Sequence, residues 1–299
     1  MAEKKKSMGF DEIMRNLKAG NFSPIYILMG NEAYYIDKIA DYIAENALAP
    51  EERDFNQEIV FGADTTATQI VDMAKGYPMM APRRVIIVKE AQGLKNLEPI
   101  EKYLANPSAT SLIVLCHKNG TIDARKKIIA KAQAVGVVFE SKKLKDYQLP
   151  SFIEGYLKTR KAAIENKAVM MIAEAVGADL SRLTSELEKI LISLPDNDRR
   201  VTPEVVEEQI GVSKDFNSFE LRDAIVNRDV YKANLIIKYF DSNPKAGSLF
   251  SILPLLFNYF QNLMIAFYAP ERTNENSVAS FLGLKLSLIH ISEPTRLRC

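Results

Sequence analysis

Apolar positions in the first half of the chain follow two alternating spacings. Continuous runs rich in β-branched residues predict strands over residues 24–29, 58–61, 84–88, 111–116 and 137–139. Apolar residues at helical spacing predict helices over residues 10–19, 36–43 and 128–135. Because buried parallel strands are apolar on both faces and alternate with helices, the pattern indicates an α/β domain with a mostly parallel sheet covered on both sides.

Helical patterns dominate after residue 149, where the strand signals fade. One face of residues 180–194 is apolar, and Asp179 stands where its side chain can cap that helix. Thr202-Pro203-Glu204 predicts another helix start, with a hydroxyl cap, a proline at the first position and an acid near the positive end of the dipole. A further helical pattern covers residues 249–268, and we expect Pro254 to kink or break that helix.

These patterns predict three domains. They are an α/β domain over residues 8–148, a small helical domain over residues 149–212 and an all-α domain over residues 213–285. The length of 299 residues accommodates two or three domains at about 100–150 residues each. Hydrophobic residues make up 47% of the chain, which supports packed cores and argues against disorder.

Charge and cysteine usage narrow the class of protein. The 39 basic and 38 acidic side chains leave a net charge of +1, whereas a protein whose main task is gripping DNA is usually more basic. Any DNA contact is therefore expected to be local and shared with partners. No apolar run approaches the ~18–20 residues of a membrane helix, and no apolar stretch of a signal peptide follows the first lysines. Two cysteines, Cys116 and Cys299, offer no disulfide framework or zinc spacing and favour a reducing cytoplasm.

The turn after the first predicted strand stands where a nucleotide-binding α/β domain carries its phosphate loop. Such a loop needs glycines, a lysine for the outer phosphates and a hydroxyl for magnesium. Residues 30–38 read Gly-Asn-Glu-Ala-Tyr-Tyr-Ile-Asp-Lys, without Gly-Lys-Ser/Thr. We interpret Gly30, Asn31 and Glu32 as a degenerate phosphate loop, because Glu32 brings negative charge towards phosphates and two tyrosines fill the space of a nucleotide. Neither ATP hydrolysis nor a bound cofactor is expected.

Other catalytic arrangements are weaker. Cys116 and His117 are neighbours, which makes a nucleophile–base pair conceivable. Adjacent strand residues face opposite sides of a sheet, however, which favours a buried cysteine and a histidine at a strand end. The strand over residues 84–88 ends in Lys89-Glu90 rather than in paired acids that could hold a metal ion. We therefore predict no catalytic residue and no metal site.

The order of these features resembles the delta subunit of the bacterial DNA polymerase III clamp loader. The similarity extends over roughly residues 8–285. The segments that carry it are Pro-Ile-Tyr-Ile-Leu-Met-Gly-Asn-Glu at 24–32, the helix, strand and Lys-Lys-Leu at 126–144, Gly-Ala-Asp-Leu-Ser-Arg-Leu-Thr-Ser-Glu-Leu-Glu-Lys at 177–189 and Phe-Asn-Ser-Phe-Glu-Leu-Arg-Asp-Ala-Ile at 216–225.

The resemblance implies a fold, a function and a set of partners. The fold would be a AAA+-like α/β parallel-sheet domain, then a helical lid over residues 149–212 and an all-α collar over residues 213–285 that joins a pentameric ring. The function would be that of a non-catalytic subunit of the DNA polymerase III holoenzyme, which binds the sliding clamp and helps open it for loading onto primed DNA. The partners would be the clamp, the gamma/tau and delta-prime subunits and primer-template DNA within the assembly, with no membrane.

The same family grips the clamp with two adjacent large apolar residues just before the third strand. Met79 and Met80 of Tyr77-Pro78-Met79-Met80-Ala81-Pro82 match that position, where some members carry a leucine–phenylalanine type of pair. Flexible, polarizable methionines adapt to shallow apolar pockets, and flanking prolines limit the ordering entropy that docking costs. The alternative is that both methionines fill the core of their own domain.

The end of the chain has an unusual sequence. Residues 286–296, Leu-Ser-Leu-Ile-His-Ile-Ser-Glu-Pro-Thr-Arg, resemble the translation of a transposon-derived sequencing adapter. We therefore expect residues 286–299 to be an artefact and give His290 and Cys299 no functional meaning. A genuine C-terminal helix is the alternative. On the adapter interpretation the collar is truncated, because the family's collar continues through further helices.

Two rival functions remain open from the sequence. The related delta-prime subunit is expected to carry a zinc-binding cysteine cluster and a Ser-Arg-Cys motif, and neither occurs in the chain. An active P-loop ATPase of unknown role is the rival from another class. A nucleotide-binding assay separates that rival from the clamp-loader subunit.

Overall fold

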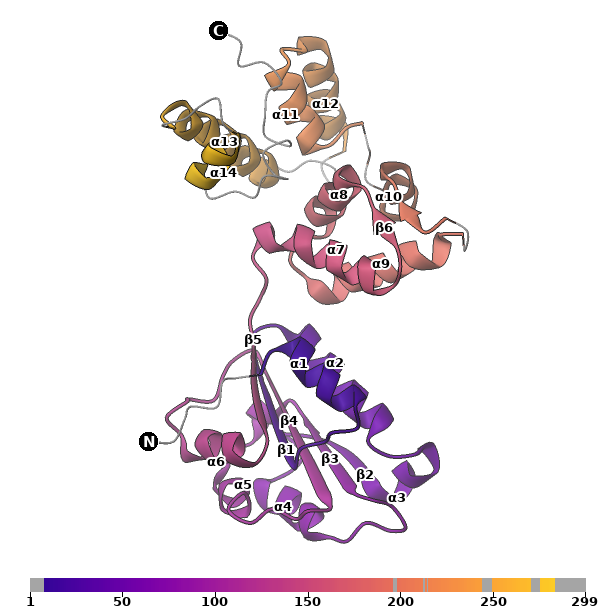
Figure 1. The fold of residues 1–299 in the computed structure, drawn as a ribbon, viewed down its shortest axis with the longest axis vertical. Helices are drawn as coiled ribbons and strands as arrows, with labels where there is room; N and C mark the ends of the chain where they lie inside the picture. The colour runs from indigo at the N-terminus through magenta and orange to yellow at the C-terminus, as the bar shows by residue number, and fades with distance from the viewer. Residues whose placement is uncertain are drawn as a thin grey trace. The chain divides into compact units, whose positions relative to one another are not determined.

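The structure, a computed structural model, describes residues 8–195, 198–211, 213, 215–243, 249–269 and 275–282. The chain divides into two compact units, Met1–Leu144 and Lys145–Cys299 (Figure 1). The first unit is α/β and the second is mainly helical. The division of the second unit into a lid and a collar stays a prediction, and the tail over residues 286–299 lies outside the described ranges.

A parallel sheet forms the centre of the first unit. Its strands are β1 (Ile25–Gly30), β2 (Gln57–Phe61), β3 (Arg84–Lys89), β4 (Ser111–Lys118) and β5 (Val137–Ser141). They lie in the order β2-β3-β4-β1-β5, and all neighbouring pairs are parallel. Each strand coincides with a predicted apolar run, so the α/β prediction is confirmed. The inner strand β1 is buried along its length, whereas the edge strand β2 is only partly covered.

Helices cover both faces of this sheet (Figure 1). On one face lie α1 (Phe10–Lys18) and α2 (Ala33–Asn46), and on the other lie α4 (Ala67–Lys75), α5 (Glu98–Tyr103) and α6 (Lys127–Val135). The short elements are η1 (Pro50–Glu52), α3 (Arg53–Asn56) and η2 (Ala91–Gly93). Hydrophobic spacing did not predict α3, α4 or α5, although Thr66 and Gln69 form a capping box at the start of α4.

The second unit begins with the turn η3 (Asp146–Gln148) and contains two successive groups of helices. The first group is α7 (Leu149–Thr159), α8 (Asn166–Val176), α9 (Leu180–Ser193) and α10 (Pro203–Ile210), with the strands β6 (Ala163–Ile164) and β7 (Arg200–Val201). The second group is α11 (Ser218–Val226), α12 (Val230–Ser242), α13 (Leu249–Phe267) and α14 (Glu275–Leu282). Among the described residues, none of these helices has both the length and the apolar character that crossing a bilayer requires.

Three details of the second unit test the sequence predictions. The Asp179 carboxylate accepts the Arg182 N–H at 3.0 Å, which confirms the predicted cap of α9. Thr202 is the residue before α10, but its hydroxyl makes no capping hydrogen bond, so that prediction is wrong in part. Of the predicted kink or break at Pro254, the break is wrong, because α13 continues through it, and the kink stays a prediction. The parallel pair β6–β7 was missed.

Candidate functional site

The loop after β1 packs against Ser141 at the end of β5. Gly30 has a φ of +132°, and a Cβ atom there would stand 2.1 Å from the carbonyl oxygen of Ser141. Only glycine allows this approach without displacing the backbone. The glycine of the degenerate phosphate loop therefore serves the contact between β1 and β5.

Backbone donors that a phosphate would need are already used in this loop. Phosphate loops bind their ligand through free N–H groups at the N-terminus of a helix. Here the donors meet protein acceptors: Gly30 N to Gly120 O at 2.9 Å, Asn31 N to Ser141 O at 3.3 Å, Glu32 N to Ser141 Oγ at 3.2 Å and Tyr34 N to Glu32 Oε1 at 3.2 Å. The loop has the place of a phosphate loop, but these four N–H groups are not available to a phosphate.

Glu32 occupies the position that an anion would take. Its side chain is buried and caps the N-terminus of α2 through the Tyr34 N–H. A carboxylate is favourable at the positive end of a helix, and it repels a phosphate brought to the same place. Tyr35 packs against Phe10 with ring centroids 4.7 Å apart, and burial raises the pKa of Tyr35 to about 12. Protein side chains thus fill the space beside the loop.

Charged side chains at the carboxyl ends of the strands are paired with one another. The Nζ atom of Lys118 lies 2.7 Å from Asp37 and 3.7 Å from Glu90, and Lys89 lies 4.0 Å from Asp41. Each acid named here therefore faces a lysine rather than another acid. Within the described ranges, no group of three or more His, Cys, Asp or Glu side chains could hold a metal ion.

Cys116 and His117 do not form a catalytic pair. Cys116 is buried in the core on the α1–α2 face of the sheet, and burial raises the pKa of its thiol to about 12. The His117 ring instead lies 3.2 Å from the carbonyl oxygen of Gly120. A thiol that stays protonated at neutral pH is a poor nucleophile, so this site has no support as a catalytic centre.

The loop that connects α4 to β3 exposes the two methionines. We call residues 76–83 the anchor loop. Met79 is 62% exposed and Met80 is 101% exposed, and neither belongs to a buried core cluster. Tyr77 is exposed beside them. The alternative that both methionines fill the core of their own domain is therefore wrong.

Contacts in the middle and at the C-terminal end of the anchor loop hold it on the domain. The Asn56 side chain bonds to both the N–H and the carbonyl of Met79. Ala81 packs against the core of the α1–α2 face, and the Arg83 guanidinium lies 4.6 Å from the centroid of the Phe22 ring. Arg84, the first residue of β3, pairs with Glu58 of β2. Sequence patterns gave no sign of the Asn56 contact.

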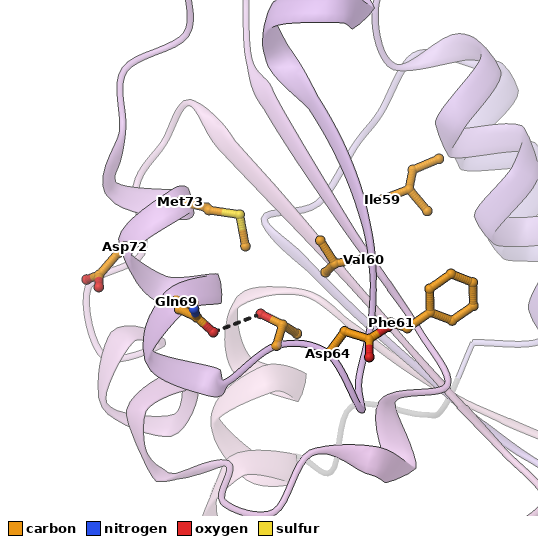
Figure 2. Close-up of a pocket in the computed structure, with 8 residues that line it drawn as sticks. Ile59, Val60, Phe61, Asp64, Gln69, Asp72 and Met73 are labelled. Atoms are coloured by element: carbon orange, nitrogen blue, oxygen red, sulfur yellow. Dashed lines mark hydrogen bonds between the residues drawn. The ribbon is translucent and has the colours of Figure 1, made fainter.

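A shallow pocket of about 640 Å³ lies between the edge strand β2 and α4 (Figure 2). Val60 and Met73 point into it, while Ile59 and Phe61 point to the other side of the strand (Figure 2). The residues that line it are Ile59, Val60, Phe61, Asp64, Thr65, Gln69, Asp72 and Met73. The hydroxyl of Thr65 in this set donates to the Gln69 side chain at 3.4 Å rather than to a carboxylate, so the lining shows no activated nucleophile. The anchor loop remains the candidate site.

Comparison with known proteins is consistent with this geometry. The model of the family described as "DNA polymerase III, delta subunit" matches residues 26–142. The Bacillus subtilis (strain 168) protein "DNA polymerase III subunit delta" is 25% identical over 286 residues, which cover 92% of this chain and 81% of that protein. The matched family segment contains both the degenerate phosphate loop and the anchor loop.

A solved structure shares the fold. It is described as "Bacillus subtilis DNA clamp loader delta protein (YqeN)", and it superposes with a TM-score of 0.59 at 23% sequence identity. The match covers 95% of this chain and 86% of that one. The expected arrangement, a parallel α/β domain followed by a helical region, is therefore confirmed.

Proposed function

We propose, from a resemblance to the delta subunit of DNA polymerase III that extends over 92% of the chain, that this protein is a delta subunit of a bacterial clamp loader. In this role it binds the sliding clamp and helps open it for loading onto primed DNA. It performs no chemistry of its own. The enzymatic activity belongs to the holoenzyme of which the subunit is a part.

The observation that carries the proposal is the exposed pair Met79 and Met80. A fully exposed methionine gains nothing from folding, because its apolar surface stays in water. The same surface is available to a partner with a shallow apolar pocket, to which a flexible thioether side chain can adapt. The position of the pair, directly before β3, is the one that the resemblance assigns to the clamp contact.

The loop after β1 supports a subunit without ATPase activity. The donors of Gly30, Asn31 and Glu32 are bonded to protein acceptors, and the Glu32 carboxylate holds the N-terminus of α2. No observation in the described part of the chain favours the rival P-loop ATPase. ATP-driven movement would come from other subunits of the assembly, of the gamma/tau type.

A stripe of exposed apolar residues on α13 supports contacts with other loader subunits. We call it the α13 stripe; its members are Leu253, Phe257, Phe260, Met264 and Phe267. Their spacings of four and three residues place them on one side of the helix, as in the seam of a coiled coil. The buried residues Ile252 and Tyr259 lie on another side, where α13 packs within its own unit. The gamma/tau and delta-prime subunits are the proposed partners of this stripe, and primer-template DNA is bound within the assembly.

Titration of the chain with its cognate sliding clamp tests the proposed function. Calorimetry without nucleotide is the appropriate measurement, because the proposal places the clamp contact outside the phosphate loop. We expect a dissociation constant in the micromolar range or below, which is typical of a specific regulatory interface. A clamp that shows no binding at the highest soluble concentrations would refute the assignment.

A further inference from the structure

We propose that Asn56 is the positioning residue of the clamp-binding methionines, since it fixes the backbone of Met79 in the conformation that presents both side chains to solvent. The inference rests on the proposed function for the identity of the partner. The contact between Asn56 and Met79 does not depend on it. Asn56 itself is not assigned any contact with the clamp.

The Asn56 side chain makes a two-point contact with the anchor loop. Its Oδ1 atom accepts the Met79 N–H at 2.6 Å, and its Nδ2 group donates to the Met79 carbonyl at 2.9 Å. The Nδ2 group also donates to the carbonyl of Glu52 at 2.9 Å. A single primary amide therefore holds the backbone of Met79 and ties it to the turn that precedes α3.

Burial makes this contact specific for asparagine. Asn56 is 1% exposed, so its own amide must find its partners within the protein rather than in water. Two carbonyl oxygens require a donor and one N–H requires an acceptor, and a primary amide satisfies all three at once. An aspartate would keep the acceptor but would face two carbonyl oxygens with a negative charge. An alanine would remove both contacts with Met79, whereas the carbonyl of Glu52, the N-cap of α3, would keep the first intrahelical hydrogen bond.

The constraint extends from Met79 to its neighbour. Met80 has a φ of +51°, in the left-handed region that a non-glycine residue rarely adopts. Pro78 and Pro82 limit the backbone on either side, and Ala81 packs into the core. A loop that is already ordered loses less conformational entropy when it docks, which favours tight binding. Asn56 therefore contributes to clamp affinity without touching the clamp.

Asn56→Ala is the direct test, with two readouts. We expect hydrogen exchange of the Met79 amide to accelerate in the free protein, while the amides of β3 and β4 stay protected. We expect the affinity for the clamp to fall about tenfold, because the loop must now be ordered on binding. The matched control is Asn46→Ala, since the Asn46 side chain also donates to a backbone carbonyl near the end of a helix, that of Tyr42, but is exposed. It should change neither readout.

Asn56→Asp gives a second test that a purely structural role would not satisfy. Above the pKa of the new carboxyl, its charge repels the carbonyls of Met79 and Glu52, and clamp binding is weakened. As pH falls, the protonated acid regains a donor, so its affinity should recover towards the wild-type value measured at the same pH. Because this comparison uses only Asn56→Asp and the wild type, it also decides the matter if Asn56→Ala does not fold.

The outcomes are distinguishable. Unchanged exchange of the Met79 amide in Asn56→Ala, or accelerated exchange with unchanged clamp affinity, overturns the positioning role. An Asn56→Asp affinity that follows the wild type at every pH overturns it as well. If the wild type itself does not bind the clamp, the proposed function fails, and the exchange readout still decides whether Asn56 holds the loop.

Discussion

The carbonyl oxygen of Ser141 lies 2.1 Å from the point where a Cβ atom would stand at Gly30. In an active nucleotide-binding domain, the corresponding glycine lets the backbone approach a phosphate. Here the absence of a side chain at Gly30 lets the end of β1 approach the end of β5. The loop therefore requires a glycine for the contact with β5. The backbone N–H groups of Gly30, Asn31 and Glu32 bond to protein acceptors instead of a phosphate.

Replacing Gly30 with alanine should destabilise the first unit. The new methyl group meets the backbone of Ser141 rather than a flexible side chain, and a φ of +132° is strained for alanine. We expect a loss of about 2–4 kcal/mol in the free energy of unfolding, measured by chemical denaturation. Gly155→Ala is the control: nothing lies within 4 Å of its Cβ position in α7, so it should stabilise by about 0.5–1 kcal/mol. Equal effects of the two changes would be inconsistent with the closed loop.

The isolated chain should bind no nucleotide. The N–H groups of Gly30, Asn31, Glu32 and Tyr34 are bonded to protein acceptors, and the Glu32 carboxylate opposes an anion at the start of α2. Calorimetric titration with ATP and magnesium should give no heat beyond dilution. A dissociation constant in the micromolar range would restore the P-loop ATPase as the better hypothesis.

The Cys116 thiol should be inert in the folded protein. In a Cys299→Ser variant, Cys116 is the only cysteine. Burial raises its pKa to about 12 from the usual value of about 8.5. The folded state therefore holds the proton more tightly, and this contribution to stability is complete below about pH 8.5 and is lost as pH rises towards 12. A thiol reagent at pH 8 should label the unfolded but not the folded protein, and rapid labelling of the folded protein would contradict the burial.

A charge on the α13 stripe should impair assembly and leave clamp binding unchanged. Phe257→Glu places a carboxylate in the middle of the exposed apolar side. We expect loss of co-migration with the gamma/tau and delta-prime subunits in size-exclusion chromatography, because an apolar contact would then have to bury a charge. Asn258→Glu adds the same charge away from the stripe and should assemble normally. If Phe257→Glu also joins the other subunits, the stripe is not their contact.

The sequence predicts those parts of the structure that depend on residues close together along the chain. The strands follow directly from β-branched runs such as Val85 to Val88, because burial on both faces leaves a clear pattern. The helix α4 is marked instead by its capping box, Thr66 and Gln69, which hydrophobic spacing does not detect. The pair β6–β7 has only two residues in each strand, too few for any periodicity.

The candidate site was predictable only in part. The resemblance pointed to Met79 and Met80, but hydropathy could not decide between core and surface, since methionine is apolar in either place. The contact between Asn56 and Met79 joins positions 23 residues apart, so no local pattern contains it. Closing of the phosphate loop likewise depends on Ser141, which lies 109 residues from Glu32.

The double variant Met79→Ser with Met80→Ser tests the central claim most directly, through its affinity for the sliding clamp measured together with its thermal melting. Burying one methionine contributes about 1.5–3 kcal/mol, so losing both should weaken binding by about two to four decades at ~1.4 kcal/mol per decade. Both side chains are exposed, and the variant should therefore melt like the wild type. A variant that binds the clamp at wild-type strength, or that melts far below the wild type, would contradict the assignment of the anchor loop as the clamp-binding site.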